Sequence, residues 1–429
     1  MDKKFSKRIL EGLLFKLSRA ILNAYQPQII GVTGSIGKTS AKEAIYTVLS
    51  AKFKVRKNIK NYNNEIGLPL TIIGAAGGGR SPLGWLKVFL QAFFLLIRQD
   101  KNYPRFLVLE MGADRIGDLK YLTTLAPCKV GVVTGVAPVH LEYFKTLEKI
   151  AKEKSVIVSH LPADGWAILN ADNQYTAAMT QATKAKVLTY GFGAEAAVRA
   201  LEINFSQGDS DQLSGISFKL AYDGSTVPVL LPDILGQHLV YAALAGAAVG
   251  IAFGMNLVSI AQALEKFKAP NGRMRLIAGI KDTLIIDDTY NASPESMLAA
   301  INTEVKIKVS GQKYAVLGDM LELGDFTQAG HEKIGEAVVA NGIDYLITVG
   351  ERARIIADQA QALGMDKDKV FSFGDAIAAA RFVQERIKAG DLILIKGSQG
   401  MRLEKTVKEI MAEPLRAREL LVRQEAPWI

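Results

Sequence analysis

The chain has 429 residues, of which 49% are hydrophobic, and it carries a formal net charge of +9. This length favours two or three domains, and the hydrophobic fraction is sufficient for ordinary globular cores. The single cysteine, Cys128, excludes an internal disulfide and fits a reducing compartment, and four histidines with one cysteine exclude a zinc-finger array. The positive charge favours anionic partners, and the sequence has no nucleic-acid-binding motif, so we predict no nucleic-acid partner.

Two segments combine apolar and basic residues. Residues 1–28 carry six Lys or Arg and two acids, with leucines and isoleucines at roughly helical spacing, which predicts a basic amphipathic helix. Lys16 and Arg19 interrupt any apolar core and exclude a secretory signal. Residues 80–105 contain a run of large apolar side chains that is too short to span a bilayer. Two interpretations stay open: both segments lie on an anionic membrane surface, or they pack on each other or on the main domain.

A phosphate-binding loop follows the first apolar run. Residues 28–32 predict a buried strand, residues 33–40 read TGSIGKTS, and residues 41–50 have helical spacing. Strand, glycine loop and helix form the context in which backbone N–H groups close around phosphates. The strict pattern has a glycine where this chain has Val32, and Gly31 lies one position earlier. The alternative, a chance glycine turn before a helix, is disfavoured by the flanking residues.

The loop assigns roles to several residues. Lys38 is placed to reach the β- and γ-phosphates of a nucleotide, and the Thr39 hydroxyl to hold Mg²⁺. The remaining residues of the predicted nucleotide site are Gly34, Ser35, Gly37 and Ser40.

Strands and helices alternate along the rest of the chain. Apolar strands are expected at residues 106–110, 130–134, 166–170 and 186–190, which argues for a largely parallel sheet with helices on both faces. Residues 196–230 predict a small antiparallel addition, and residues 239–267 predict packed helices. A composition break at residues 269–272 precedes a second α/β series, with strands expected at 284–287, 314–317, 345–349 and 392–395. We therefore predict an N-terminal helix (1–28), a central α/β domain (29–271) with an apolar insertion at about 77–105, and a Rossmann-like α/β domain (272–429).

Polar residues follow several of these strands. Glu110 ends a strand near the phosphate loop and is a plausible Mg²⁺ ligand, because open parallel sheets bind ligands at the carboxyl ends of their strands. His140 follows the next strand; a lone loop histidine is more often structural, and composition does not decide. Lys152 and Lys154 lie on a helix and, taken alone, form a solvated face.

The second domain has three polar clusters at strand ends, in residues 287–294, 318–324 and 396–398. Three such clusters are hard to explain by solubility alone. The simplest arrangement is a cleft between the two domains with ATP bridging them.

Taken together, these segments resemble the Mur ligases, the ATP-dependent amide-forming enzymes of bacterial cell-wall synthesis, and most closely the branch that adds D-alanyl-D-alanine. The resemblance covers about residues 28 to 410. Seven motifs occur in the family's order: the phosphate loop, residues 61–71 (NYNNEIGLPLT), 110–113 (EMGA), 140–142 (HLE) with 151–154 (AKEK), 170–173 (NADN), 287–292 (DDTYNA) and 318–324 (GDMLELG).

The resemblance implies a fold and a mechanism. The fold is a central phosphate-loop ATPase domain plus a C-terminal Rossmann-like domain. ATP phosphorylates a peptide carboxylate, the amine attacks the acyl phosphate, and amide, ADP and phosphate result. Carried over to this chain, Lys38 binds phosphate, Thr39 and Glu110 hold one Mg²⁺, and His140 holds a second with a carbamylated lysine, which matches Lys154 better than Lys152.

The resemblance also implies substrate contacts. Asn63 and Asn64 would position the acceptor, and Arg273 and Asp288 would contact the nucleotide from the second domain. The remaining candidates for the substrate region are Tyr290, Asn291, Asp319, Glu322, His331 and Lys396.

Three departures limit the transfer. The family usually has an N-terminal domain that binds the UDP part of the substrate, and only about 28 residues precede the first strand here. Leu239 and Ala242 stand where asparagines near the adenine are expected. The apolar segment 80–98 lengthens a connection that is normally short. These departures motivate the hypothesis that the acceptor is a lipid-linked or otherwise unusual precursor.

We therefore predict a cytoplasmic, monomeric, ATP- and Mg²⁺-dependent ligase that joins D-alanyl-D-alanine to a nucleotide- or lipid-linked muramyl peptide, and peripheral contact with the inner membrane surface stays open. Two alternatives stay open. One is an amide ligase of another pathway, of the polyglutamate, cyanophycin or pseudomurein type. The other is a non-catalytic regulatory ATPase with the same fold.

Overall fold

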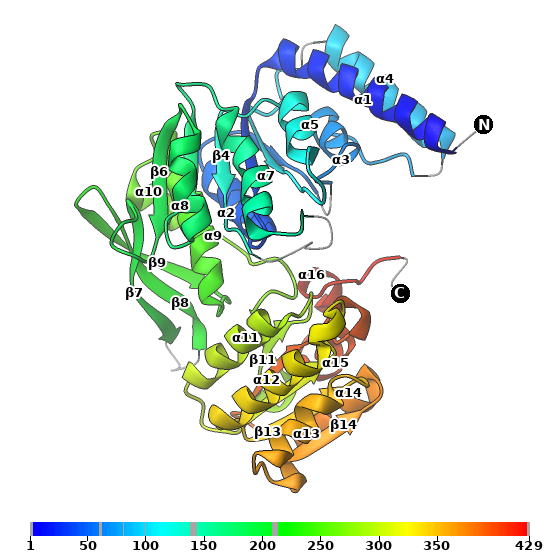
Figure 1. Cartoon of the computed structure of the whole chain (residues 1–429), viewed down its shortest axis with the longest axis vertical. Helices are drawn as coiled ribbons and strands as arrows, with labels where there is room; N and C mark the ends of the chain where they lie inside the picture. The colour runs from blue at the N-terminus through cyan, green and yellow to red at the C-terminus, as the bar shows by residue number, and fades with distance from the viewer. Residues whose placement is uncertain are drawn as a thin grey trace. The chain divides into compact units, whose positions relative to one another are not determined.

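The structure, a computed structural model, describes residues 3–59, 62–79, 81–98, 100–137, 144–207 and 213–426. The contacts between its residues divide the chain into two compact units (Figure 1). The first comprises Met1–Ile203, Ser217–Leu230 and His238–Phe267, and the second comprises Asn204–Ile216, Leu231–Gln237 and Lys268–Ile429.

A nine-stranded sheet in the order β2-β3-β1-β4-β5-β6-β7-β8-β9 forms the framework of the first part of the chain. Its strands are β1 (Gln28–Thr33), β2 (Val55–Lys57), β3 (Phe106–Glu110), β4 (Val130–Val133), β5 (Trp166–Asn170), β6 (Lys186–Gly191), β7 (Val198–Gln207), β8 (Leu213–Tyr222) and β9 (Ser225–Pro232). The pairs from β2 to β7 are parallel, which confirms the prediction of a largely parallel sheet.

The antiparallel addition predicted at residues 196–230 is a β-hairpin at one edge of this sheet. Strands β8 and β9 are joined by only Asp223 and Gly224, whose φ angles are 48° and 73°. A two-residue turn in which both residues have positive φ has a backbone twist that matches the right-handed twist of the two strands it joins.

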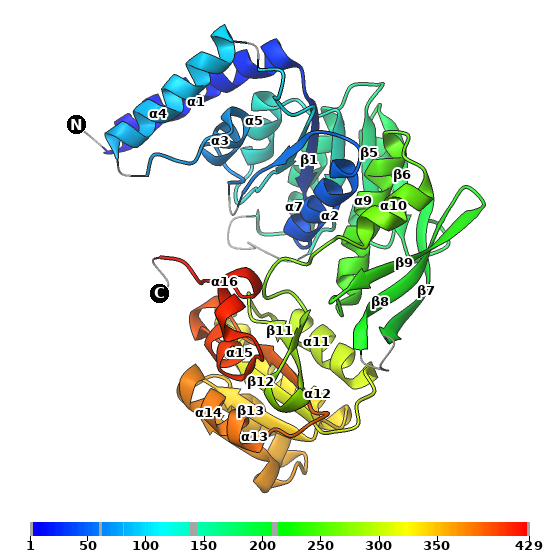
Figure 2. The same ribbon diagram turned by 180° about the vertical axis from the view of Figure 1, so that it is seen from behind.

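Helices cover both faces of the sheet (Figure 2). They are α1 (Lys3–Tyr25), α2 (Lys38–Ser50), α3 (Gly67–Ile73), α4 (Pro82–Ile97), α5 (Asp118–Leu125), α7 (Leu147–Ser159), α8 (Gln174–Ala177), α9 (Gln237–Ala252) and α10 (Leu257–Leu264). Apolar side chains alternate between the faces, because successive strand residues point to opposite sides. Leu107 and Leu109 of β3 join the core formed with α1, α3, α5 and α7. On α9, Gly246 allows close packing, because a Cβ there would lie 3.0 Å from the Ala44 backbone of α2.

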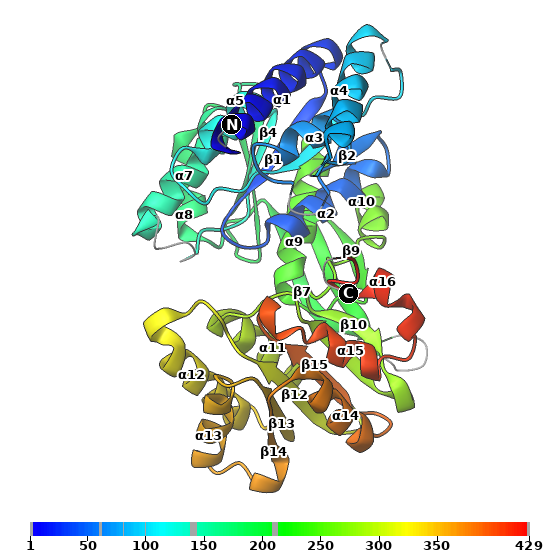
Figure 3. The same ribbon diagram turned by 90° about the vertical axis from the view of Figure 1, so that its right-hand side faces the viewer.

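The second unit is built on a six-stranded sheet in the order β10-β11-β15-β12-β13-β14 (Figure 3). Its strands are β10 (Arg275–Ala278), β11 (Leu284–Asp288), β12 (Lys313–Gly318), β13 (Tyr345–Val349), β14 (Val370–Phe373) and β15 (Leu392–Lys396). Only β10 and β11 pair antiparallel. The helices are α11 (Pro294–Lys306), α12 (Thr327–Ala340), α13 (Arg354–Ala362), α14 (Ala376–Arg386), α15 (Glu404–Ile410) and α16 (Ala417–Leu420). The α/β fold predicted for this region is confirmed.

Local sequence explains where α11 begins. Ser293 caps the helix by accepting a hydrogen bond from the backbone N–H of Ser296, whose hydroxyl in turn accepts from the backbone N–H of Ser293. Pro294 occupies the first turn, where its missing N–H leaves no helical bond unmade. The helix start keeps residues 287–293 outside the helix, at the carboxyl end of β11.

Candidate active site

The phosphate loop lies between β1 and α2. Gly34 has φ 147° and Gly37 has φ 76°, and a Cβ on Gly34 would lie 2.1 Å from the Thr134 hydroxyl, so only glycine fits there. Ser35 anchors the loop to the chain after β4: its N–H donates to the Gly135 carbonyl at 2.8 Å, and its hydroxyl donates to the Ala137 carbonyl at 3.1 Å. The loop is therefore held open by backbone geometry before any ligand binds.

Lys38 and the start of α2 supply the positive end of this site. The Lys38 ammonium donates to the Gly34 carbonyl at 2.8 Å and to the Ser35 carbonyl at 3.2 Å, so the side chain curls over its own loop. Gly37 precedes α2 without a side-chain cap, which leaves helical N–H groups for an anion. Ser40 is buried in the first turn of the same helix.

Glu110 ends β3 next to this loop. Its Oε1 accepts a hydrogen bond from the Thr39 hydroxyl at 3.2 Å, and its Oε2 lies 3.5 Å from the Lys42 ammonium. The carboxylate is only 5% exposed, and Oε2 has no hydrogen-bond partner among the described residues. Thr39 and Glu110 therefore lie in contact, as the sequence predicted for two ligands of one cation.

Asn58, which the sequence analysis did not single out, fixes the main chain of Glu110. Its Oδ1 accepts from the Glu110 N–H at 2.9 Å, and its Nδ2 donates to the carbonyls of Tyr62 at 3.0 Å and Glu110 at 3.3 Å. Asn58 is fully buried. Its position directly after a short strand was the only available signal, since its partner is 52 residues away in the chain.

Lys154 of α7 differs from its neighbour Lys152. Lys154 is buried and donates to the Ala113 carbonyl at 3.2 Å, whereas Lys152 is exposed. Burial, with a smaller contribution from the nearby charge of Lys38, lowers the pKa of Lys154 to about 8. The expectation of a solvated face is therefore wrong for Lys154. His140, the predicted partner, lies outside the described residues.

Asn63 and Asn64, the two asparagines predicted to position the acceptor substrate, have different roles in the structure. The Asn63 carbonyl accepts from the Gly112 N–H at 3.0 Å, which places it against the segment that follows Glu110. The Asn64 side chain accepts from the N–H groups of Ile66 at 3.3 Å and Gly67 at 3.0 Å, at the start of α3. Asn64 thus stabilises a helix end in this state.

In the second unit, Asp288 and Lys396 form a buried ion pair. The Lys396 ammonium is 2.7 Å from Asp288 Oδ2 and also donates to the Asn291 carbonyl at 2.8 Å. Burial lowers the pKa of Lys396, and the charge of Asp288 opposes that shift. Arg273 lies over the Tyr290 ring, 4.1 Å from its centroid. The structure thus brings together two residues, Asp288 and Lys396, that the resemblance assigned to different substrates.

The loop after β12 is held by two other predicted residues. His331 is fully buried; its Nε2 accepts from the Met320 N–H at 3.1 Å, and its Nδ1 lies 2.7 Å from the Thr327 carbonyl. Asp319 accepts from the Ala353 N–H at 2.7 Å. Glu322, by contrast, is exposed and has φ 66°, a strained angle for a residue with a side chain. Of the three, only Glu322 presents its side chain to solvent.

The region expected near the adenine is apolar on α9. Leu239 and Ala242 are both buried. Between them, Tyr241 donates to Asp172 at 2.9 Å and stacks on Phe192 with ring centroids 4.0 Å apart.

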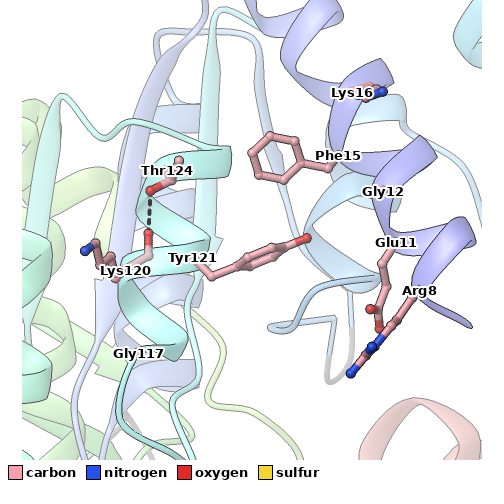
Figure 4. A pocket seen from close by; sticks show the side chains of 9 residues that line it. All are labelled: Arg8, Glu11, Gly12, Phe15, Lys16, Gly117, Lys120, Tyr121 and Thr124. Carbon is pink, nitrogen blue, oxygen red and sulfur yellow. Dashed lines mark hydrogen bonds between the residues drawn. The ribbon is translucent and has the colours of Figure 1, made fainter. Parts of the chain in front are cut away.

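A cavity of about 650 Å³ lies elsewhere in the first unit, between α1 and α5 (Figure 4). Its lining includes Phe15, Lys16, Lys120 and Tyr121, and none of the predicted site residues.

The chemistry of the first unit fits a magnesium ion. Mg²⁺ is held by oxygen ligands, usually one or two carboxylates together with phosphate oxygens and water. The unsatisfied Oε2 of Glu110 and the adjoining Thr39 hydroxyl are such ligands beside a phosphate loop. The described residues contain no group of three or more His, Cys, Asp or Glu suited to a metal.

Comparisons with known proteins agree with this geometry. The family model "Mur ligase middle domain" matches residues 32–79 and 90–250, and "Mur ligase, glutamate ligase domain" matches residues 272–399. The UDP-N-acetylmuramoyl-tripeptide–D-alanyl-D-alanine ligase of Bacillus subtilis (strain 168) is 33% identical over 402 residues, covering 94% of this chain and 80% of the relative. The ligase of the same name from Escherichia coli (strain K12) is 31% identical over 386 residues, covering 89% and 76%.

Solved structures give the same result. The MurF ligase of Thermotoga maritima in complex with ADP superposes with a TM-score of 0.74 at 27% identity, covering 95% of this chain and 84% of that chain. A crystal structure of MurF from Acinetobacter baumannii gives a TM-score of 0.76 at 26% identity, covering 92% and 79%.

The fold and the phosphate-loop site define a nucleotide-using enzyme of the ligase class. The chain belongs to the Mur ligase family, and the predicted resemblance and fold are confirmed.

Proposed function

We propose that this chain is an ATP-dependent ligase that joins D-alanyl-D-alanine to the peptide carboxylate of a muramyl tripeptide. The observation that carries the proposal is the buried Glu110 carboxylate at the phosphate loop, whose Oε1 accepts a hydrogen bond from Thr39 and whose Oε2 makes no hydrogen bond to the described residues. The names of the relatives, which cover most of this chain, supply the substrates.

The proposed reaction has two steps. A carboxylate oxygen attacks the γ-phosphorus, and ADP leaves, which gives an acyl phosphate. The nitrogen of D-alanyl-D-alanine then attacks the acyl carbon and loses a proton, and the C–O bond to phosphate breaks, so that amide and phosphate remain. Lys38 compensates the charge of the transferring group, and the loop N–H groups orient it. Mg²⁺ held by Thr39 and Glu110 would neutralise the phosphate oxygens.

Lys154 is our candidate for the carbamylated lysine. A neutral amine attacks CO₂, loses a proton and becomes a carbamate with two oxygens. A pKa of about 8 leaves a useful neutral fraction at neutral pH, and Lys154, unlike the exposed Lys152, is buried in the same unit as Glu110. His140 would complete the second metal site. In the second unit, Lys396 orients Asp288, and Arg273 and Tyr290 remain nucleotide and substrate candidates. Asn63, Asn291, Asp319 and Glu322 remain candidates on the substrate side.

The muramyl tripeptide that accepts D-alanyl-D-alanine is either UDP-linked or lipid-linked. We favour the lipid-linked form, because α1 is a basic, amphipathic helix suited to an anionic lipid surface. We further propose that the enzyme works as a monomer in the cytoplasm, at the inner membrane surface.

A product assay tests the proposal. Purified enzyme, ATP, Mg²⁺ and D-alanyl-D-alanine are offered UDP-linked muramyl tripeptide, and then its lipid-linked equivalent, with detection by mass spectrometry. We expect an amide product and equimolar ADP, both lost in Lys38→Ala because the charge compensation is removed. Lys52→Ala, an exposed lysine after α2, is the matched control and should retain activity. ATP hydrolysis that needs neither acceptor nor amine would instead indicate a regulatory ATPase.

A further inference from the structure

Helix α4 exposes an apolar face. Six large side chains on it are between 46% and 71% exposed: Leu83, Leu86, Leu90, Phe93, Phe94 and Ile97. At 100° per residue they fall within an arc of about 100° on one side of the helix. A continuous exposed apolar stripe on a folded unit indicates a surface that another body covers.

The opposite side of α4 is fixed to the rest of the first unit. Val88 and Ala92 are buried in the core shared with α1 and α3. Helices α1 and α4 lie side by side (Figures 1 and 2). Tyr25, at the end of α1, donates to the Leu95 carbonyl at 2.8 Å and the Arg98 carbonyl at 3.2 Å, and it stacks on Tyr103 with centroids 4.1 Å apart. The exposed stripe is therefore carried on a rigid support.

Positive charge lies along one border of the stripe and on the neighbouring helix α1. The sequence of α1 contains six basic residues and one acidic residue, and α4 contains Lys87 and no acid. The two helices thus hold most of the formal net charge of +9. On α4, Lys87 and the capping residue Arg98 are exposed along one border of the stripe.

The cavity between α1 and α5 brings two basic residues of α1 together with one of α5. Arg8, Lys16 and Lys120 contribute its cations, and Glu11 is its one acid (Figure 4). The rings of Phe15 and Tyr121 lie between them, 5.6 Å apart. An apolar floor with a cationic rim suits the glycerol and phosphate region of an anionic lipid.

No helix in the described part of the chain is long and apolar enough to cross a membrane. The 16 residues of α4 extend about 24 Å, less than the hydrocarbon thickness of about 30 Å. A helix with an apolar face, basic flanks and this length is suited to lie in the plane of the interface.

We propose that α1 and α4 together dock the first unit on an anionic lipid membrane, with the α4 stripe inserted among the acyl chains and the basic residues on the headgroups. A second copy of the chain is a poorer occupant, because an antiparallel two-fold contact through this stripe would place the border of Lys87 and Arg98 against the same border of the other copy. The family match supports a separate role for these helices, since it begins at residue 32, after α1, and is interrupted at residues 80–89, at the start of α4. The inference does not depend on the ligase reaction.

Vesicle flotation tests it with the full chain. Vesicles of phosphatidylcholine with 30% phosphatidylglycerol, on the order of a bacterial anionic fraction, are compared with pure phosphatidylcholine at low and high salt. The test variant is Leu90→Gln, Phe93→Gln, Phe94→Gln. The matched control changes three exposed apolar residues elsewhere, Val258→Gln, Leu363→Gln and Leu415→Gln, which are between 49% and 99% exposed.

We expect the wild-type chain and the control to float with the anionic vesicles and to be released by salt. The α4 variant should bind at least tenfold more weakly, since it loses three large apolar side chains. A second variant, Arg8→Gln, Lys16→Gln, Lys87→Gln, should lose roughly fivefold per cation. All three variants change exposed side chains, and unchanged melting temperatures verify their folding.

Two results would overturn the proposal. One is a wild-type chain that stays unbound on anionic vesicles. The other is a self-association of the wild-type chain in solution that the α4 variant abolishes, because the stripe would then belong to a second copy. Neither result bears on whether the amide product forms.

Discussion

Replacing Lys154 by methionine is expected to stabilise the protein while removing its activity. The ammonium is buried in α7 and makes one hydrogen bond, to the Ala113 carbonyl at 3.2 Å. Burial disfavours the charged form and lowers the pKa from 10.5 to about 8. Folding must therefore either desolvate the charge or release its proton, and methionine has a similar length without this cost.

The magnitude follows from proton linkage. The unfolded chain keeps the Lys154 proton up to pH 10.5, whereas the folded chain loses it near pH 8. Between these values the unfolded state binds more protons, so wild-type stability rises with pH, and the full penalty is present below pH 8. It is about 3 kcal/mol at pH 7. Lys154→Met removes this penalty but also loses the hydrogen bond to the Ala113 carbonyl, which costs about 1 kcal/mol of stability. Lys154→Met should thus be about 2 kcal/mol more stable at pH 7 and within about 1 kcal/mol of wild type at pH 10.

Urea unfolding at pH 7 and pH 10 in CO₂-free buffer measures this difference. Other titrating groups occur in both proteins and cancel in the comparison. Lys152→Met, on the exposed side of the same helix, is the matched control and should leave stability unchanged at both pH values. A difference between wild type and Lys154→Met that is the same at pH 7 and pH 10 would refute the reasoning.

Two further predictions concern residues whose partners are distant in sequence. Asn58→Ala should lower turnover ten- to a hundredfold, because two hydrogen bonds of about 1 kcal/mol each hold the Glu110 main chain and are lost; a steady-state assay with unchanged turnover would contradict this. Lys396→Met should destabilise the second unit by about 3–5 kcal/mol by leaving Asp288 buried without its partner. Adding Asp288→Asn should recover part of that loss in thermal melts, and additive losses would exclude the coupling.

The strands and the phosphate loop were predictable because their information is local. Residues 106–109 are continuously apolar and Glu110 follows them, and residues 106–110 form β3 with the predicted bounds. The contact between Thr39 and Glu110 was also predictable. Both residues lie at the carboxyl ends of β1 and β3, which are neighbours in a parallel sheet.

Other site residues were not predictable in this way. The resemblance made His331 and Lys396 candidates for the substrate region, and Lys396 also ends an apolar strand. In the folded chain, His331 satisfies backbone groups, and Lys396 neutralises Asp288, 108 residues away. Asn58 belongs to no recognisable motif, although it holds the main chain of Glu110, on which the proposed magnesium site depends.

By itself, the sequence determined the phosphate loop, the order of the α/β elements and membership in the Mur ligase family, because these depend on residues that are close together in the chain. The tertiary structure decided which polar groups are buried, which are paired, and which apolar face of α4 remains open to an outside partner. The reason is physical: burial and pairing depend on contacts between residues far apart in sequence, and these contacts set the pKa of Lys154 and the partners of Glu110.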